Sequence, residues 1–303
     1  MPPGSMPRRW ASPPRTEAET PMAKIVATLG VAHAPGVTGW IDKAPRHEQD
    51  GVLDGYAQFQ KLMDEVRPDV VIGVANDHLL NFSLDNIPDF CVGIGEQWAG
   101  PAPWFRDWLN VPDYTVRGHR DLGRALVRES ARAGINHAFA DKLLFDDNWS
   151  VPLKFLFPRY DVRFIPIHMN PVVPPVPTAA HCHAVGETIA RIVQAFPSDE
   201  RVVIMGTGGL SHDPGGKDYF TVHEEFDRWF LALMEEGNAE RVKRELTFEK
   251  LLTGGDGGAA ELLAWVVAMG AAGVCGNARA ETVFYVPSVP MRCGMGGVYW
   301  RLE

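Results

Sequence analysis

Three histidines in the chain each lie directly after a run of apolar residues that is typical of a buried β-strand. His33 follows LGVA, His78 follows VVIGVAND and His212 follows VVIMGTGGLS. In an open α/β sheet the carboxyl ends of the parallel strands share one edge, and ligand crevices form along it. Although these histidines lie far apart in the sequence, they are therefore expected to meet in space.

A carboxylate is expected to join them, because Glu261 lies at the start of a late apolar segment, GGDGGAAELLAWVVAMG. Two imidazoles and one carboxylate are a common donor set for non-haem iron(II), and a spare imidazole beside them can act as an acid or base. The same donors with an open position also suit Zn²⁺. Taken alone, a carboxylate at this position is also explained as a partner of the helix dipole.

Polar side chains near the histidines in sequence, or at neighbouring strand ends, are candidates for orienting them or for contacting substrate. A hydrogen bond to the second ring nitrogen of a ligating histidine fixes the tautomer and direction of the ring. The alternative is that such residues only cap turns and strand ends. The candidates are Asn76, Asp77, His168 and Thr207.

The composition excludes several classes of protein. The chain has 303 residues, of which 46% are apolar and 22% charged, which is ordinary for a globular protein. Its net charge of −9 argues against nucleic-acid binding, which needs a basic face. The four cysteines form no CxxC pair, so a reducing cytoplasm is expected. We also expect no membrane association, because no apolar run is expected to reach the length that spans a bilayer and the N-terminus lacks the apolar core of a signal peptide.

The order of strand and helix signals predicts an α/β fold. A strand at 24–32, a helix at 51–66 and a strand at 70–75 make one βαβ unit. The pattern recurs, with helices expected at 120–134, 184–196 and 261–270, a largely helical stretch at 221–252, and strands at 163–169 and 201–208. We predict one domain over residues 23–303, with a mostly parallel central sheet flanked by helices and the active site at the carboxyl ends of its strands.

Three further segments are expected to lie outside the regular elements. Residues 1–22 are rich in Pro, Arg and Ser and are predicted to be a disordered leader. The Pro-rich stretches 86–114 and 166–178 are predicted to be irregular, and loops of that length usually cover or border a functional site.

Taken together, the motifs AHAPG, NDH, GTGGLSH and GAAELLAW resemble, in order and context, those of the class III extradiol ring-cleavage dioxygenases. The likeness extends from about residue 23 to the C-terminus and includes FSLDNIP after the second histidine and VPL at 151–153. It implies that His33, His78 and Glu261 bind Fe(II) and that His212 is the catalytic acid/base. It also implies a small dihydroxylated aromatic or heteroaromatic substrate, whose ring is opened with O₂ beside the two oxygen substituents.

Two departures from the family pattern bear on the substrate. The family often has another histidine before VPL, in an Asp-His-Gly context, where this chain reads FDDNWSVPL. We assign that place to Asn148, which cannot shuttle a proton, so His212 is expected to work alone. The C-terminal VPSVPMRCGMGG lacks the small polar pair expected around a bound carboxylate. A hydroxypyridone, an aminophenol or another substituted diol is therefore expected rather than a simple catechol.

The resemblance leaves the assembly and two other functions open. Some relatives have a small capping domain or subunit, and here the Pro-rich stretches or a partner subunit would cover the site. A homo-oligomer, a dimer or larger, is the default expectation. One alternative function is a non-catalytic binding protein on the same fold. The other is a zinc-dependent hydrolase, which the absence of an HExxH motif disfavours.

Overall fold

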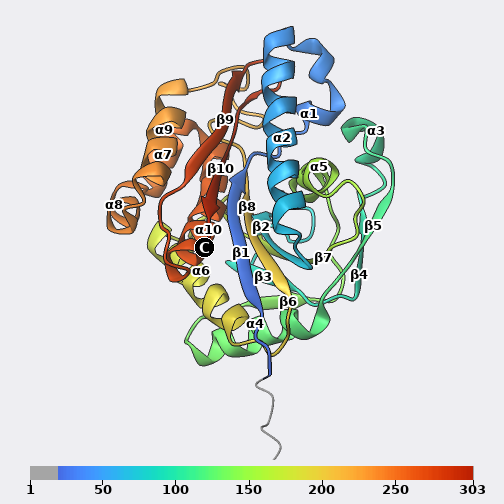
Figure 1. Ribbon diagram of the computed structural model, residues 1–303. Helices are drawn as coiled ribbons and strands as arrows, with labels where there is room; N and C mark the ends of the chain where they lie inside the picture. Colours follow the sequence, from blue (N-terminus) through green and yellow to red (C-terminus); the bar gives the residue numbers. More distant parts are fainter. Residues whose placement is uncertain (1–19, 303) are drawn as a thin grey trace, which may run out of the picture.

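A computed structural model describes residues 20–302 of the chain, which form one large sheet with helices on both of its faces (Figure 1). Of the predicted leader at 1–22, residues 1–19 lie outside the described part of the chain. The strands are β1 Lys24–Val31, β2 Val70–Asn76, β3 Phe90–Gly93, β4 Gln97–Gly100, β5 Tyr114–Arg117, β6 Ala138–Ala140, β7 Arg163–Met169, β8 Arg201–Thr207, β9 Glu281–Ser288 and β10 Cys293–Arg301.

The strand order is β4-β5-β7-β2-β8-β1-β10-β9, and β3 pairs with β7 and β6 beside this path. The five strands from β5 to β1 are parallel, whereas β10 and β9 extend the sheet in antiparallel fashion. At the other edge β4 is antiparallel to β5. The predicted α/β fold with a mostly parallel central sheet is confirmed, and the parallel centre places the carboxyl ends of β1, β2, β7 and β8 along one edge.

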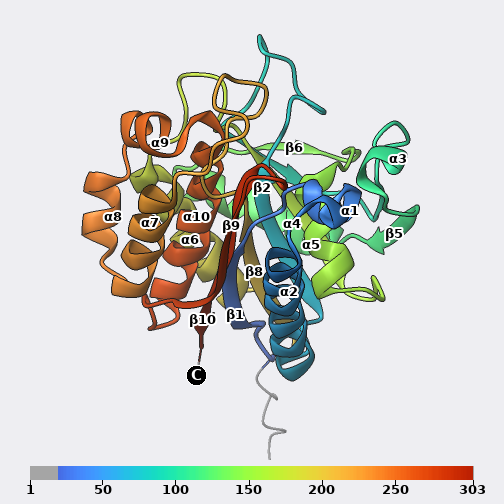
Figure 2. The ribbon, with the colours of Figure 1, turned by 90° about the horizontal axis from the view of Figure 1, so that it is seen from above.

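Ten α-helices and two 3₁₀ helices are present in the described part of the chain. They are α1 Gly36–Gly39, η1 Ile41–Lys43, α2 Arg46–Val66, α3 Arg106–Leu109, α4 Arg120–Arg132, α5 Asp147–Leu156, α6 Ala179–Gln194, α7 Glu224–Glu236, α8 Ala239–Glu245, α9 Phe248–Gly255, η2 Gly257–Leu262 and α10 Leu263–Val274. Figure 2 shows α6 and α10 on one side of the sheet and α2 and α5 on the other.

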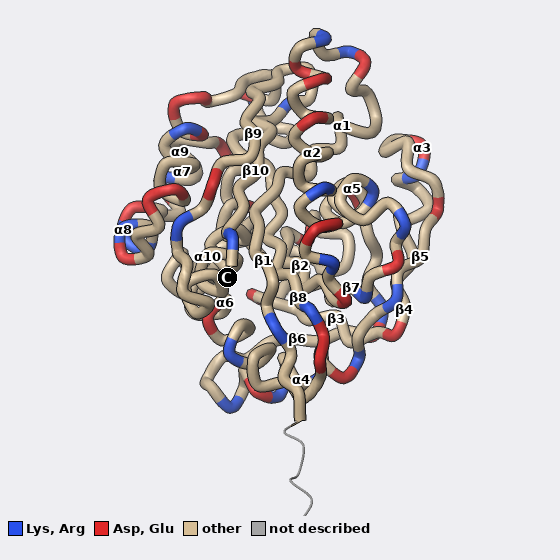
Figure 3. The backbone as a smooth tube through the Cα atoms, in the orientation of Figure 1, with Lys and Arg blue, Asp and Glu red and all other residues tan. Residues whose placement is uncertain are grey.

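Two apolar cores lie on the opposite faces of the sheet, because successive strand residues point to alternate sides. Along β2, Ile72 packs into the core beneath α6 and α10, whereas Val71 packs into the core beneath α2 and α5. All seven residues of β2 are buried, and the central strands carry few charged residues (Figure 3). Burial on both faces explains why these strands read as continuous apolar runs, and it makes their ends a rigid platform.

The long elements agree with the sequence prediction to within a few residues. The strand at 163–169 is found as predicted, and the stretch 221–252 is divided among α7, α8 and α9. The helix expected at 184–196 begins five residues earlier, at Ala179, where Thr178 accepts a hydrogen bond from the backbone of His181. An N-terminal cap of this kind extends a helix beyond its periodic apolar face.

The short elements differ more. The stretch 86–114 was predicted to be irregular, which is wrong in part, because it contains β3, β4 and α3 and reaches the first residue of β5. The hairpin of β9 and β10 was not predicted at all. Elements of four residues such as QWAG in β4 are too short to show a periodicity, and they exist because neighbouring strands supply hydrogen bonds. The stretch 166–178 was also predicted to be irregular, which is wrong for 166–169, because they belong to β7, whereas residues 170–178 have no helix or strand.

One stretch, Gly257–Val274, is long and apolar enough to cross a membrane by length and composition. The expectation that no such run exists was therefore wrong, since Glu261 is the single charged residue among these 18 positions. In the structure this stretch comprises η2 and α10, and 83% of it is buried within the protein. The packing of α10 against α6 and the sheet accounts for its apolar character.

Candidate metal and catalytic site

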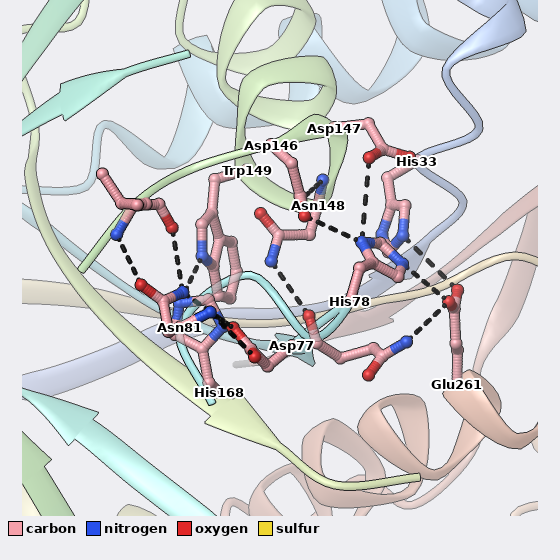
Figure 4. Close-up of polar contacts among 12 residues, drawn as sticks. His33, Asp77, His78, Asn81, Asp146, Asp147, Asn148, Trp149, His168 and Glu261 are labelled. Atoms are coloured by element: carbon pink, nitrogen blue, oxygen red, sulfur yellow. Dashed lines mark hydrogen bonds and ion pairs between the residues drawn. The ribbon is translucent and has the colours of Figure 1, made fainter. Parts of the chain in front are cut away.

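Two histidines and a glutamate from three distant parts of the chain converge at the carboxyl edge of the sheet (Figure 4). His33 follows β1, His78 follows β2, and Glu261 lies in η2, directly before α10. The Nε2 atom of His78 is 3.0 Å from Glu261 Oε1, and the Nε2 atom of His33 is 3.4 Å from Glu261 Oε2. The sequence-predicted trio is thus brought together, with its donor atoms facing one another.

His33 is held by the strand next to its own. Because β1 and β8 are parallel neighbours with Val31 opposite Thr207, the Thr207 side chain lies beside the segment that carries His33. The Nδ1 atom of His33 is 3.0 Å from the Thr207 hydroxyl, and both residues are buried. With Nδ1 engaged by the hydroxyl, Nε2 is left to face Glu261, so Thr207 has the orienting position predicted for it.

His78 is oriented by a carboxylate that the sequence analysis did not single out. Its Nδ1 atom is 3.1 Å from Oδ2 of the buried Asp146, whose Oδ1 accepts a hydrogen bond from the backbone N–H of Asn148 at the start of α5. The neighbouring carboxylate of Asp147 lies 3.7 Å from the same ring nitrogen. A carboxylate on Nδ1 fixes the tautomer in which Nε2 is free to bind a cation.

Glu261 is buried, and two hydrogen-bond donors reach its oxygens in addition to the histidines. The backbone N–H of Gly209 donates to Oε2 at 2.9 Å, and the side-chain amide of Asn76 donates to Oε1 at 3.2 Å. This close approach requires glycine in the preceding loop, since a Cβ atom on Gly208 would lie 2.6 Å from Glu261 Cβ. Asn76 therefore positions the carboxylate, and the GTGGLSH segment brings a backbone donor to it.

His212 lies beside this trio with one ring nitrogen bound and the other turned toward it. Its Nδ1 donates to the carbonyl of Leu210 at 2.8 Å, which leaves Nε2 as an acceptor 3.8 Å from Glu261 Oε1. The main chain of η2 passes so close to the ring that a Cβ atom on Gly258 would overlap His212 Nε2. The imidazole is 15% exposed, which leaves it open to a ligand in the adjoining cavity.

Burial and mutual charge shift the pKa values in this cluster in opposite directions. Burial lowers the pKa of His33 to about 4, against the opposing charge of Glu261. Burial also acts to lower the pKa of His78, but Asp146 and Asp147 outweigh it and hold that pKa well above its usual range. The pKa of Glu261 is depressed because the histidines around it outweigh the effect of its burial. An ionised carboxylate between two imidazoles is a setting that favours a bound cation.

Two carboxylates are candidates for the third ligand of a metal ion. One donor atom each from His33, His78 and Asp147 lies within 4.8 Å of the others, a group that could hold a metal. Glu261 lies closer to both imidazoles, at 3.0 and 3.4 Å. Adjacent ligands at bond lengths of about 2.1 Å and right angles are separated by about 3 Å, so Glu261 fits an octahedral neighbour of both histidines. The buried donor set of two imidazoles and a carboxylate fits a non-haem metal.

The remaining predicted residues support the site from behind. Asp77 is fully buried and accepts backbone hydrogen bonds from Asn81 and Phe82, which shapes the turn after His78. His168 was expected to reach the rim of the site, but it is buried, with its Nε2 accepting from the indole of Trp149 and its Nδ1 3.3 Å from Asp77. Neither residue lines the cavity.

In the FDDN segment, the residue that faces the site is not the one that was expected. Asn148 is buried and donates to the backbone carbonyl of Asn76, so it turns away from the cavity, which Asp147 lines instead. Burial raises the pKa of Asp147 to about 7. The signal that could have found both aspartates was present in the sequence: two acidic residues in an otherwise apolar segment are costly to bury without a partner.

A cavity of about 560 Å³ opens beside these groups, a volume typical of small-molecule sites. His33, His78, His212 and Glu261 lie at its inner wall, and apolar side chains make up most of the rest. The apolar and aromatic lining residues include Trp40, Phe105, Trp108, Phe248, Leu252 and Met291. The site thus combines a buried cluster of metal-binding groups with an apolar space large enough for a substituted aromatic ring.

Comparison with known proteins agrees with this chemistry. Residues 27–290 match the family model described as the catalytic LigB subunit of aromatic ring-opening dioxygenase. The chain is 26% identical over 320 aligned residues to 2,3-dihydroxyphenylpropionate/2,3-dihydroxicinnamic acid 1,2-dioxygenase of Escherichia coli strain 55989, with 90% of this chain and 98% of the relative covered. The enzyme of the same name from Escherichia coli O81 is 25% identical over the same span.

A solved structure has the same fold. The crystal structure of an uncharacterized protein from Escherichia coli K12 superposes with a TM-score of 0.56, covering 90% of this chain and 99% of that protein. The two sequences are 14% identical, so this likeness concerns the arrangement of the sheet and helices alone.

Proposed function

The chain belongs to the LigB family of aromatic ring-opening dioxygenases and is an extradiol-type ring-cleavage enzyme, and from this premise we propose that it uses Fe(II) held by His33, His78 and Glu261, with His212 as the acid/base. The observation that carries the proposal is the convergence of these three donors, whose facing atoms are 3.0 and 3.4 Å apart. Two neutral imidazoles and one carboxylate leave three positions free on an octahedral ion.

His33, His78 and Glu261 would hold the Fe(II), which would supply the electron transfer between the aromatic diol and O₂. Residues of the protein orient the ligating side chains and exclude water. Asp146 keeps His78 in the tautomer that presents Nε2, Thr207 holds the ring of His33 in place, and the Gly209 N–H and Asn76 amide position the Glu261 carboxylate. The apolar wall excludes water and packs against the aromatic ring.

His212 is the group suited to move protons. Its Nδ1 is committed to the Leu210 carbonyl, so Nε2 is the atom that takes the proton of the second substrate hydroxyl. His212 returns the proton when the ring opens. In the overall reaction one ring carbon–carbon bond beside the diol is broken, and both oxygen atoms of O₂ end in the product. An imidazole can make both transfers near neutral pH.

The proposed substrate is a small dihydroxylated aromatic or related heteroaromatic compound of the catechol, gallate, aminophenol or hydroxypyridone type. The catechol type is supported by the relatives, which are named for 2,3-dihydroxyphenylpropionate. We also propose that the enzyme works in the cytoplasm as a homo-oligomer. Either a second copy of the chain or a small capping subunit would cover the mouth of the cavity. Family membership weighs against the zinc hydrolase and the non-catalytic binding protein.

The test is O₂ uptake by protein loaded anaerobically with Fe(II), measured over a panel of these four substrate types and 2,3-dihydroxyphenylpropionate. We expect uptake that depends on substrate, with His33→Ala losing both iron and activity. His212→Asn is expected to keep its iron and lose turnover. The control is His47→Ala, which changes an exposed histidine of α2. Full activity in His33→Ala, or full activity of protein freed of iron, would contradict the proposal.

A further inference from the structure

Arg292 lies in the tight turn between β9 and β10, and it lines the same cavity as the metal-binding groups. Its φ of 63° is in the left-handed region, and its N–H donates to the Val289 carbonyl at 3.0 Å. Glycine adopts this conformation without the steric cost that arginine incurs. An arginine at this position therefore carries a steric cost that glycine would not.

Three aromatic rings hold the guanidinium group. Its central carbon is 4.3 Å from the centre of the Tyr219 ring, 5.1 Å from that of Trp40 and 5.3 Å from that of Phe220. The Tyr219 hydroxyl also accepts a hydrogen bond from Nη1. Trp40 is fixed in turn, because its indole N–H donates to the Pro290 carbonyl of the hairpin turn at 2.9 Å. The guanidinium is therefore held in one place before any ligand arrives.

The segments that form this cage are those that carry the catalytic groups. Trp40 follows α1, which begins three residues after His33, and Tyr219 lies seven residues after His212. Figure 2 shows the turn of the β9–β10 hairpin close to α1. Both Trp40 and Tyr219 line the cavity, as does Cys293 directly after the arginine. A ligand in this cavity can thus contact the guanidinium and the metal-binding groups together.

The charge of Arg292 is not balanced by the protein. Among the residues that the structure describes, Arg292 forms no ion pair with a carboxylate, and it is the one Lys or Arg that lines the cavity. The other charged groups of the lining are acidic: Asp146, Asp147, Asp213 and Glu261. A half-buried guanidinium that faces a cavity without an anion is a site that a ligand's negative group completes, and its planar fork matches a carboxylate.

We propose that Arg292 binds an anionic substituent, most simply a carboxylate, on the ring that the enzyme cleaves, and so determines substrate specificity. This inference rests on the proposed function, since it deepens the identity of the substrate. It departs from the expectation drawn from the C-terminal segment VPSVPMRCGMGG, in which the lack of a small polar pair argued against a carboxylate. In the structure that segment presents a guanidinium instead.

The test compares an acid with its uncharged analogue on the Fe(II)-loaded full chain. The substrates are 2,3-dihydroxyphenylpropionate and the corresponding propanamide, which has nearly the same shape. We expect the acid to be favoured about 10- to 100-fold in kcat/KM, mainly through KM, as for a charge-assisted hydrogen bond. Arg292→Met should abolish this preference by raising KM for the acid, with kcat and the amide little changed. Arg292→Lys, which keeps the charge without the fork, should be intermediate.

A matched control is Arg228→Met, which removes an arginine that also packs on a tyrosine ring, 4.9 Å from Tyr285, but does not line the cavity. It should keep the wild-type preference for the acid. Wild-type enzyme that turns over acid and amide equally well would overturn the role of Arg292 and leave the proposed function intact. An acid preference that persists in Arg292→Met would also overturn it.

A second measurement separates this inference from the proposed reaction. Binding of 3-phenylpropionate and 3-phenylpropanamide, which lack the hydroxyl groups, is followed anaerobically by the fluorescence of Trp40 and its neighbours. We expect the acid to bind at least 10-fold more tightly than the amide in the wild type and equally in Arg292→Met. If no diol is turned over, the proposed function fails, and this binding preference still decides whether the anion site exists.

Discussion

At the scale of single residues, the site is defined by how three carboxylates are arranged around one pair of histidines. Glu261 faces Nε2 of both His33 and His78, whereas Asp146 and Asp147 lie on the Nδ1 side of His78. The Glu261 oxygens also receive the Gly209 and Asn76 donors, which favour the ionised form. Asp147 has a pKa raised by burial to about 7, so it is less suited than Glu261 to be a permanent anionic ligand.

We therefore expect Glu261→Gln to weaken Fe(II) binding by more than about 100-fold, and Asp147→Asn by about 10-fold or less. The physical reason is that only the first change removes an anionic donor about 3 Å from both imidazoles. Anaerobic competition with a chelator measures the affinity, and metal analysis gives the stoichiometry. The reverse order of the two variants would transfer the role of third ligand to Asp147.

At the scale of elements, the parallel strands supply the positions and the glycine-rich loops supply the close approach. His212 is brought to the trio by the loop after β8 and is enclosed by the start of η2, whose Gly258 N–H donates to the His212 carbonyl at 3.0 Å. The loop and η2 pack so closely that a side chain on η2 at this point has no room. The direction of the catalytic imidazole is thus a property of two packed segments and not of His212 alone.

Gly258→Ala should lower kcat about 10- to 100-fold while iron content stays unchanged, because the added methyl group displaces the His212 ring. The matched control is the neighbouring Gly257→Ala, where an added Cβ meets no atom within 4 Å. Steady-state O₂ uptake and iron analysis of both variants measure the difference. Equal activity of the two variants would show that the ring tolerates displacement, and loss of iron in Gly258→Ala would assign the glycine to the metal site.

The opposite edge of the sheet is joined by an ion-pair cluster around Glu200, just before β8. Its carboxylate lies 2.9 Å from Nε2 of His119, which caps α4, and it also pairs with Arg163 at the start of β7. Burial acts to raise the pKa of Glu200, but the hydrogen bond and charge of His119, with Ser198 and Arg163, hold it below its usual range. The cluster therefore ties a helix and two strands together through one ionised group.

Glu200→Gln is expected to lower the free energy of unfolding by about 2 kcal/mol at neutral pH, as for loss of hydrogen bonds to a charged group. A depressed pKa in the folded state contributes stability that is present above the unfolded pKa of about 4.3 and is lost as pH falls through the folded pKa. The difference in free energy of unfolding between the wild type and Glu200→Gln should thus become smaller below about pH 4. Urea unfolding at pH 7, 5 and 3.5 measures it, with exposed Glu235→Gln as control. A gap that widens in acid would contradict this account.

At the scale of the whole molecule, the sequence predicted the site residues that follow buried strands. It did not predict the residues whose position depends on side-chain packing. His33, His78 and His212 were found because a polar residue after a buried apolar run marks the carboxyl edge of the sheet. Glu261 was found because it is the one charged residue in the apolar stretch that forms η2 and α10. Asp146 and Asp147 escaped, because their neighbour Asn148 was assigned the place that Asp147 takes.

The fold shows the same division. Strands buried on both faces read as long apolar runs, so the parallel centre of the sheet was predictable. The β9–β10 hairpin was not, because glycine-rich β10 owes its place to pairing with β1 and β9 rather than to its own residues. Arg292 lies in the turn of that hairpin, and its meeting with Trp40 and Tyr219 is a tertiary contact between segments far apart in the sequence.

The last prediction concerns the stability of the whole molecule. The proposed ligands lie just after β1, just after β2 and in η2, so a bound ion ties together segments that span most of the chain. An ion that binds only the folded state stabilises it by about 2.7 kcal/mol at 100 times its Kd. For a protein of this size that should raise the Tm by about 5 °C. Anaerobic melts of wild type with Fe(II) and with a chelator measure the shift. His33→Ala should show none, and His47→Ala, on the exposed face of α2, should match the wild type. An unchanged Tm in the wild type would mean that no ion joins these segments.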